Sequence, residues 1–223
     1  MGTVAVVVIG GGPLSPRAVE AWDDLDQSGA PTLVIAADSG LDHAIAAGVR
    51  VDRLVGDLDS ISAAGRMWAY ANGVEIDEHP VAKDETDTEL ALATAVADPS
   101  VSAVIVLGGL GPATDDRLDH LLGTLAVLGH PSLSSLESVG AIVGTSEVAV
   151  LHAGRTATLP LAAGQVFSLL ALHGPCDGVT VTGARWPLHG AQLAGYEARG
   201  LSNISNGDTT VAVAEGTLTV VMP

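Results

Sequence analysis

The chain carries very few positive charges. Its 223 residues contain 9 Lys and Arg against 26 Asp and Glu, which gives a net charge of −17. Binding to nucleic-acid backbones or to anionic membranes relies on Lys and Arg that displace counterions. The charge balance therefore argues against nucleic acid and membrane surfaces as partners. The acid excess has a second interpretation, which is solubility alone.

Cysteine is almost absent, and no segment is typical of export. The single cysteine, Cys176, excludes an internal disulfide and fits a reducing cytoplasm. The apolar run over residues 3–9 is too short to span a bilayer, and no basic segment precedes it as in a signal peptide. We therefore expect a cytoplasmic protein.

Aromatic residues make up only 3% of the chain, so the core must be built mainly from the aliphatic residues that bring the hydrophobic content to 48%. In the first part of the chain, short β-branched segments alternate with segments typical of helices. This alternation predicts an α/β fold with an open, mostly parallel sheet flanked by helices. The expected strands are residues 4–9, 33–37, 53–55, 74–76 and 101–107, and the expected helices are residues 16–25, 41–47, 63–72, 86–97 and 118–128.

Toward the C-terminus the pattern changes to short alternating segments broken by glycine, as over residues 178–183. Residues 209–214 and 217–221 flank Glu215 and Gly216, and this arrangement predicts a β-hairpin. We therefore expect a smaller all-β domain that packs directly after the α/β domain, with a boundary within residues 144–154.

Polar clusters follow all five predicted strands. In an open parallel sheet, ligands bind beyond the carboxyl ends of the strands, where loops lead into helices. The convergence of these clusters predicts an active site at that edge of the sheet. The five segments are residues 10–13, 38–40, 56–60, 83–87 and 108–120.

Asp57 and Asp59 are candidate metal ligands. If the strand stays extended through this loop, residues two apart project to the same side and both carboxylates face one cation. Hard oxygen ligands of this kind favour Mg2+ over Zn2+. The same Gly-Asp-x-Asp-Ser segment is also compatible with a simple helix cap.

Lys83 is the only lysine of the chain, and it lies within the acidic segment Lys-Asp-Glu-Thr-Asp of residues 83–87. An ammonium group among carboxylates suggests a site where a cation and a lysine together neutralise phosphate. The alternative is a solvated surface ion pair. Thr86 and Glu89 also match a capping box at the start of a helix, which leaves Lys83 unexplained.

Two further segments suggest contacts with a nucleotide. Residues 10–12 are all glycine, and this stretch is either a tight turn or a loop whose backbone, at Gly11, comes close to a nucleotide. Arg117 stands where a helix begins, a position suited to gripping phosphate. Asp119 and His120 follow it and are candidates for a local pair that orients the loop.

Together these motifs resemble the ordered motifs of the thiamine pyrophosphokinase family, and the match covers nearly the whole chain. In the α/β part the resemblance rests on residues 38–40, 56–60, 83–87 and 117–120, and in the β part on residues 183–188 and 200–203.

The resemblance implies an α/β nucleotide-binding catalytic domain over residues 1–146 and a thiamine-binding β-sandwich over residues 147–223. It also implies a homodimer with active sites at the subunit interface. The activity it implies is the Mg2+-dependent transfer of pyrophosphate from ATP to thiamine, which gives thiamine diphosphate and AMP.

The resemblance assigns a role to each matching residue. Trp186 would stack on the cationic thiamine, an interaction that suits a thiazolium ring, although a core or interface anchor is the alternative for this residue. Asp87 is our candidate base for the thiamine hydroxyl, beside the catalytic Asp57 and Asp59. The assigned Mg2+ ligands are Asp38, Asp57, Asp59 and Asp84; the ATP contacts are Asp38, Lys83, Asp84, Thr86, Asp87 and Arg117; and the thiamine contacts are Trp186, Ser202 and Asn203.

The chain departs from the family pattern at three places. Ser39 stands where the family often has Gly, Asp42 stands where it often has Asn, and residues 115–116 are two Asp in place of a glycine pair. Acids beside a phosphate site weaken ATP binding unless they point away or bind another cation. A non-catalytic sensor of thiamine diphosphate or a nucleotide, and a Mg2+-dependent phosphohydrolase, are therefore the alternative functions.

Overall fold

The computed structural model describes residues 2–109 and 118–223. The chain divides into two compact units. The first unit comprises residues 1–127 and 135–145, and the second unit comprises residues 128–134 and 146–223. Within the described residues, no helix is both long enough and apolar enough to cross a membrane.

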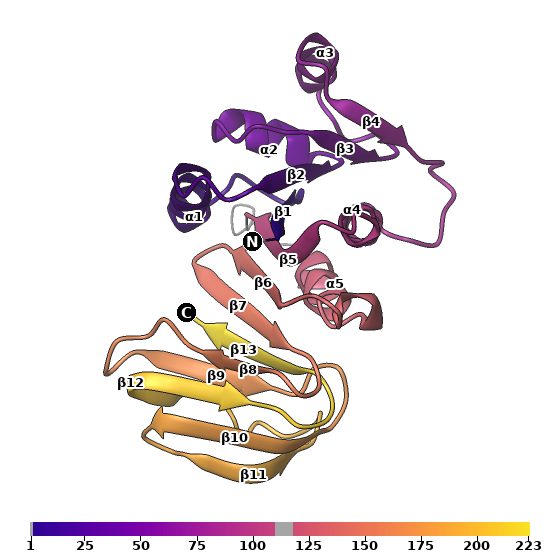
Figure 1. Ribbon diagram of the computed structural model, residues 1–223. Coiled ribbons are helices and arrows are strands. Elements are labelled where there is room, and N and C mark those ends of the chain that lie inside the picture. The colour runs from indigo at the N-terminus through magenta and orange to yellow at the C-terminus, as the bar shows by residue number, and fades with distance from the viewer. Residues whose placement is uncertain (1, 110–117) are drawn as a thin grey trace. The chain divides into compact units, whose positions relative to one another are not determined.

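The first unit is an open sheet covered by helices (Figure 1). The strands lie in the order β6-β5-β1-β2-β3-β4, and each of these pairings is parallel. The order runs from β1 in both directions, so a crevice for ligands is expected at the carboxyl ends near β1. The strands are β1 (Thr3–Val8), β2 (Thr32–Ala37), β3 (Arg53–Gly56), β4 (Glu75–Glu78), β5 (Val101–Gly108) and β6 (Ser138–Val143).

Both faces of this sheet are covered, which explains why its central strands are mostly apolar. Residues 5–8 of β1 are fully buried. One face packs against α1, α2 and α3 in a cluster that includes Val6, Trp22 and Leu41, and α4 packs against β1, β2, β3 and β5. The helices are α1 (Pro16–Gln27), α2 (Gly40–Ala46), α3 (Ala63–Ala71), α4 (Asp87–Ala97) and α5 (Leu118–Val127).

The elements of the first unit follow the sequence prediction closely. All five expected helices and all five expected strands occur, each with ends within two residues of the predicted ones. The sixth strand, β6, was not predicted, because it lies in the stretch where the periodicity changes toward the second unit.

The second unit consists mainly of antiparallel strands around their own core. Its sheet order is β11-β10-β12-β9-β13-β7, with β8 paired to β12. The inward side chains, among them Phe167, Leu169 and Val181, form a separate hydrophobic cluster. The elements are a short 3-10 helix (Pro131–Leu133), β7 (Ser146–Leu151), β8 (Thr156–Thr158), β9 (Val166–Leu170), β10 (Cys176–Ala184), β11 (Leu188–Leu193), β12 (Asn203–Ala212) and β13 (Leu218–Met222).

The predicted C-terminal hairpin is wrong. β12 pairs with β8, β9 and β10, whereas β13 pairs with β7 and β9, so β12 and β13 are not neighbours. The backbone N–H of Glu215 donates to the carbonyl of Asp177 at 3.1 Å, which ties the connecting segment to β10. Alternation and a Glu-Gly turn signal a change of direction, but they do not determine which strand becomes the partner.

Candidate active site

Three carboxylates meet beyond the ends of β2 and β3. Asp38 follows β2, Asp57 and Asp59 follow β3, and one oxygen from each lies within 4.8 Å of the others. Asp38 is only 9% exposed, and its Oδ1 is a buried atom without a hydrogen-bond partner among the described residues. A buried, unpartnered carboxylate oxygen beside two other carboxylates is costly without a cation. These residues therefore fit a hard divalent cation such as Mg2+.

The electrostatics of Asp38 point the same way. Burial raises the pKa of Asp38, and the nearby carboxylates of Asp87 and Asp57 act in the same direction. Like charges and burial both disfavour the ionised carboxylate, so the site has an affinity for positive charge. A bound cation relieves the same repulsion that raises this pKa.

Lys83 supplies part of that positive charge. Its Nζ lies 2.8 Å from Asp57 Oδ2 and 3.1 Å from Asp87 Oδ1. The side chain of Lys83 is 11% exposed, so the pair is not the solvated surface pair that was the alternative interpretation. The hydrogen bond from Lys83 lowers the pKa of Asp57, and the same bond raises the pKa of Lys83. Both groups are therefore held in their charged forms.

A turn, not an extended strand, brings Asp57 and Asp59 together. β3 ends at Gly56, and Leu58 has φ 63°, so the expected alternation along an extended strand does not continue. The backbone N–H of Asp59 instead donates to Asp57 Oδ1 at 3.3 Å. The proximity of the two carboxylates was predicted on the condition that the strand stays extended, and this condition is not met, because Leu58 has a left-handed φ.

Two glycines allow the surrounding backbone to come close. A Cβ at Gly56 (φ 144°) would lie 2.9 Å from Asp87 Oδ1 and 3.2 Å from the Cβ of Asp38. A Cβ at Gly40 would lie 2.1 Å from the carbonyl oxygen of Val8. A larger residue at Gly56 would displace Asp38 and Asp87, and a larger residue at Gly40 would push the start of α2 away from the backbone of β1.

The capping box at the start of α4 is confirmed. The backbone N–H of Thr86 donates to Glu89 Oε2 at 2.8 Å, and the N–H of Glu89 donates to Thr86 Oγ1 at 3.2 Å. This cap fixes Asp87 at the first position of α4. Asp84 is exposed and is not part of the group formed by Asp38, Asp57 and Asp59.

The glycine loop after β1 packs tightly against the end of β5. Gly11 has φ 104°, and a Cβ at Gly109 would lie 2.0 Å from the carbonyl oxygen of Pro13. Gly11 itself is exposed, as a loop that approaches a ligand requires. The proposed phosphate contact Arg117 lies outside the described residues, as do Asp115 and Asp116.

The predicted thiamine contacts differ in their surroundings. Trp186 is 52% exposed and therefore not a core residue, and the Arg185 guanidinium lies 5.0 Å from the centre of its ring. Asn203 is 6% exposed and binds the backbone of Trp186, with Oδ1 accepting from its N–H at 3.1 Å and Nδ2 donating to its carbonyl at 2.8 Å. Ser202 is exposed and has φ 57°.

Three further residues, on α2 and at the start of α3, were not assigned to the site by sequence reasoning. Asp42 accepts hydrogen bonds from the N–H and the hydroxyl of Ser62, at 2.8 and 2.6 Å. Arg66 donates to the carbonyl of Leu58 at 2.6 Å. The departure at Asp42 therefore has a structural explanation, because its carboxylate points to Ser62. The only sequence signal for a role of Arg66 was its position a few residues after the Gly-Asp-x-Asp segment.

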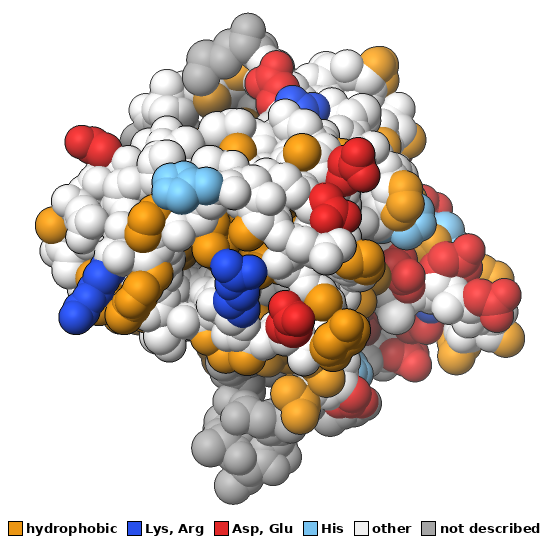
Figure 2. Space-filling model, turned by 90° about the horizontal axis from the view of Figure 1, so that it is seen from below, with side chains coloured by type: hydrophobic (Ala, Val, Ile, Leu, Met, Phe, Trp, Pro, Cys, Tyr) orange, Lys and Arg blue, Asp and Glu red, His pale blue; other side chains and the backbone are white. Residues whose placement is uncertain are grey.

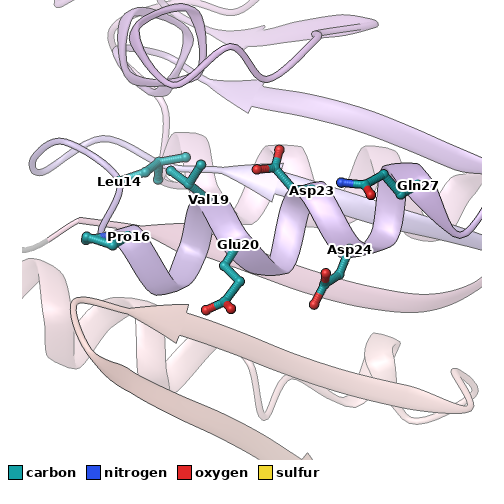
Figure 3. A pocket seen from close by; sticks show the side chains of 7 residues that line it. All are labelled: Leu14, Pro16, Val19, Glu20, Asp23, Asp24 and Gln27. Carbon is teal, nitrogen blue, oxygen red and sulfur yellow. The ribbon is translucent and has the colours of Figure 1, made fainter.

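A hollow lies along α1 (Figure 3), and Asp38, Asp57 and Asp59 are not among the residues that line it. It is lined by acidic and apolar side chains, and no described basic residue contributes to its lining. Such a hollow offers nothing that would bind phosphate. Figure 2 shows one face of the molecule, and on this face acidic side chains are more frequent than basic ones. The residues that line the hollow are Leu14, Pro16, Val19, Glu20, Asp23, Asp24 and Gln27.

In comparisons with known proteins, two family models match successive parts of the chain. The family model described as "Thiamin pyrophosphokinase, catalytic domain" matches residues 28–139, and the model described as "Thiamin pyrophosphokinase, vitamin B1 binding domain" matches residues 156–218. A search of curated proteins found no match.

Solved structures share the fold. A thiamine pyrophosphokinase from Bacillus subtilis is similar with a TM-score of 0.77 and 22% identity, over 99% of this chain and 98% of that one. One from Geobacillus thermodenitrificans has a TM-score of 0.72 and 24% identity, over 99% and 96%. The yeast enzyme has a TM-score of 0.70 and 14% identity, over 99% and 86%.

Proposed function

Since the chain belongs to the thiamin pyrophosphokinase family, we propose that it transfers the terminal pyrophosphoryl group of ATP to the hydroxyl of thiamine, giving thiamine diphosphate and AMP. The observation that carries this proposal is the cluster of Asp38, Asp57 and Asp59 with Lys83 hydrogen-bonded to Asp57 at 2.8 Å. Phosphoryl-type transfer depends mainly on positioning and charge neutralisation, which such a cluster provides.

Asp38, Asp57 and Asp59 are the proposed holders of Mg2+. When bound, the cation would neutralise charge on the phosphate oxygens. Asp38 contributes the buried oxygen that has no other partner among the described residues, and Asp57 is kept ionised by Lys83. Asp84 is not included, because it is exposed and outside the cluster.

Lys83 and Asp87, whose side chains form an ion pair at 3.1 Å, have different roles in this proposal. Lys83 stays protonated because its pKa is raised by Asp57, so it brings a fixed positive charge to the phosphates. Asp87 is the proposed acceptor of the thiamine hydroxyl proton. Its side chain is 25% exposed, which leaves it accessible to a substrate, and the α4 cap fixes its position. Thr86 contributes through that cap, and Gly11 offers backbone to the nucleotide.

In the second unit, Trp186 is the proposed platform for the cationic thiamine. Its large exposed ring supports this role. Asn203 positions Trp186 through its two backbone hydrogen bonds, so it acts on the ligand through the tryptophan. The exposed Ser202 remains the proposed direct polar contact.

We further propose that the protein is a cytoplasmic homodimer, with residues 1–146 as the nucleotide-binding catalytic domain and residues 147–223 as the thiamine-binding β-sandwich. The family membership supports the dimer, and the single cysteine supports the compartment.

The decisive test is incubation of the purified protein with ATP, Mg2+ and thiamine, followed by separation of the products. The expected products are AMP and thiamine diphosphate in equal amounts. Formation of ADP with thiamine monophosphate, or release of orthophosphate without an acceptor, would contradict the proposal. Binding of thiamine diphosphate in a calorimeter without any turnover would instead identify a sensor.

A further inference from the structure

The loop that carries Asp57 and Asp59 is held by the helix that follows it. Leu58 lies between the two carboxylates, and its carbonyl accepts a hydrogen bond from Arg66 Nη2 at 2.6 Å. Arg66 belongs to α3, whose first residue is Ala63. The contact therefore fixes the peptide group that joins Leu58 to Asp59.

Leu58 needs such support because its backbone is strained. Its φ of 63° lies in the left-handed region, which a bulky residue rarely adopts unless its surroundings impose it. The Leu58 side chain is 1% exposed and belongs to the hydrophobic cluster of the first unit. Burial holds the side chain from one side, and Arg66 holds the carbonyl from the other.

Arg66 is itself on a firmly placed helix. Ser62 caps α3 by accepting from the Gly65 N–H at 2.9 Å, and its own N–H and hydroxyl donate to Asp42 of α2 at 2.8 and 2.6 Å. A Cβ at Gly65 would lie 2.3 Å from Asp42 Oδ1, so a larger residue would have to displace this carboxylate. The start of α3 is thereby fixed to α2.

The charge of Arg66 is used in an unusual way for this chain. Acids outnumber basic residues 26 to 9, yet among the described residues Arg66 forms no ion pair with a carboxylate. Its guanidinium instead donates to the carbonyl of Leu58, between Asp57 and Asp59. Salt-bridge formation alone does not explain an arginine placed in this way.

We propose that Arg66 is a positioning residue that holds Asp57 and Asp59 in the geometry required for cation binding. The inference rests on the proposed function only in so far as the carboxylate cluster binds a divalent cation. Groups that orient metal ligands typically change metal affinity by about 10- to 100-fold when they are removed.

The test is titration of the nucleotide-free protein with Mn2+, followed by electron paramagnetic resonance of the unbound ion. Arg66→Met keeps the aliphatic stem and is expected to weaken Mn2+ binding by about 10- to 100-fold. Arg66→Lys can still donate to the Leu58 carbonyl and is expected to recover a substantial part of the loss. Arg53→Met is the matched control, because Arg53 is a basic residue at the opposite end of β3 that pairs with Glu75.

A second variant tests the support that α2 and α3 give to the loop of Asp57 and Asp59, and it removes no hydrogen-bonding group. Gly65→Ala is expected to displace the Asp42 carboxylate and to weaken Mn2+ binding, and thermal unfolding in a single cooperative transition shows that the variant still folds. If both Arg66→Met and Gly65→Ala bind Mn2+ as tightly as wild type, the inference is wrong although the proposed function stands. If wild type itself binds no Mn2+, both are overturned. Weakening by Arg53→Met to the same extent would also overturn it, because the effect would then be general electrostatics.

Discussion

Lys83 Nζ lies 2.8 Å from Asp57 Oδ2, and this contact joins residues 26 positions apart in the sequence. Both side chains are 11% exposed. An ion pair with so little exposure is screened little by salt. Its attraction offsets the desolvation of the two charges only where the geometry is good. The only lysine of an acidic chain is thus placed at the one described carboxylate cluster that suits a cation.

The first prediction concerns Lys83 itself. Lys83→Met removes the fixed charge, and we expect kcat/KM for ATP to fall by about 10²- to 10³-fold, the typical effect of losing one charge-stabilising donor. Steady-state kinetics at several ATP concentrations measures it. Arg50→Met, which removes an exposed pair with Asp52, is the control. Unchanged ATP dependence in Lys83→Met would reduce the pair to a structural one.

The second prediction compares two acids of neighbouring loops. Asp57→Asn removes a proposed ligand and the main partner of Lys83, so we expect at least about 100-fold lower activity and a higher Mg2+ requirement. Asp84→Asn changes an exposed acid outside the cluster and should alter both quantities by less than about threefold. Mg2+ titrations of activity measure both variants. Equal losses would mean that the cluster extends to Asp84.

The sequence was sufficient for the five helices and the first five strands of the first unit, but not for β6 or for the strand pairing of the second unit. Apolar runs such as β1 and the cap at Thr86 are local signals, and the structure agrees with them to within two residues. The pairing of β12 with β10 and not with β13 depends on contacts distant in the sequence.

The candidate site shows the same contrast. The residue types at Asp57, Asp59 and Lys83 indicated a cation and phosphate site, because few other arrangements use such groups together. The turn at Leu58 and the contact from Arg66 were not predictable, since both follow from tertiary packing that overrides local preference.

The third prediction is a loss of stability of the second unit in mild acid. Burial lowers the pKa of His152, with His173 and Arg155 acting in the same direction, and burial lowers the pKa of His173. Below about pH 6.5, the usual histidine pKa, the unfolded chain binds protons that the folded unit resists. The free energy of unfolding therefore decreases as the pH falls from this value toward the folded pKa values.

Thermal unfolding between pH 7.5 and 5.0 measures this effect. His152→Gln should give a shallower pH dependence of the melting temperature than wild type. His189→Gln, which changes an exposed histidine of β11, should leave the slope unchanged. An identical slope in wild type and His152→Gln would show that this histidine does not carry the effect.

The fourth prediction separates Asn203 from Trp186. Asn203→Ala removes the hydrogen bonds to the backbone N–H and carbonyl of Trp186, so we expect a loss of about 1–3 kcal/mol in stability together with weaker thiamine binding. Trp186→Ala should weaken thiamine binding by about tenfold or more with a stability change below about 1 kcal/mol, because the ring is half exposed. Calorimetric binding and chemical denaturation measure the two effects. Equal stability losses would contradict this separation.

The fifth prediction tests the proposed dimer. If each active site combines one copy's carboxylates with the other copy's tryptophan, the impaired variants Asp57→Asn and Trp186→Ala should complement each other when activity is assayed at a thiamine concentration too low to saturate Trp186→Ala. Random reassociation of an equal mixture would restore about one quarter of the wild-type sites, because half the dimers are mixed and each holds one intact site. Activity before and after reversible dissociation measures this recovery. No recovery would place each site within a single copy.

The buried side chain of Leu58 links the stability of the first unit to its ligand. Because Leu58 is part of the hydrophobic cluster and also separates Asp57 from Asp59, the core and the cation share one structural element. Binding and folding are linked, so a cation that binds only to this arrangement would raise the free energy of unfolding of the first unit. The supply of Mg2+ would then control the lifetime of the folded chain as well as its turnover. Substitutions far inside the core would change the Mg2+ concentration that activity requires.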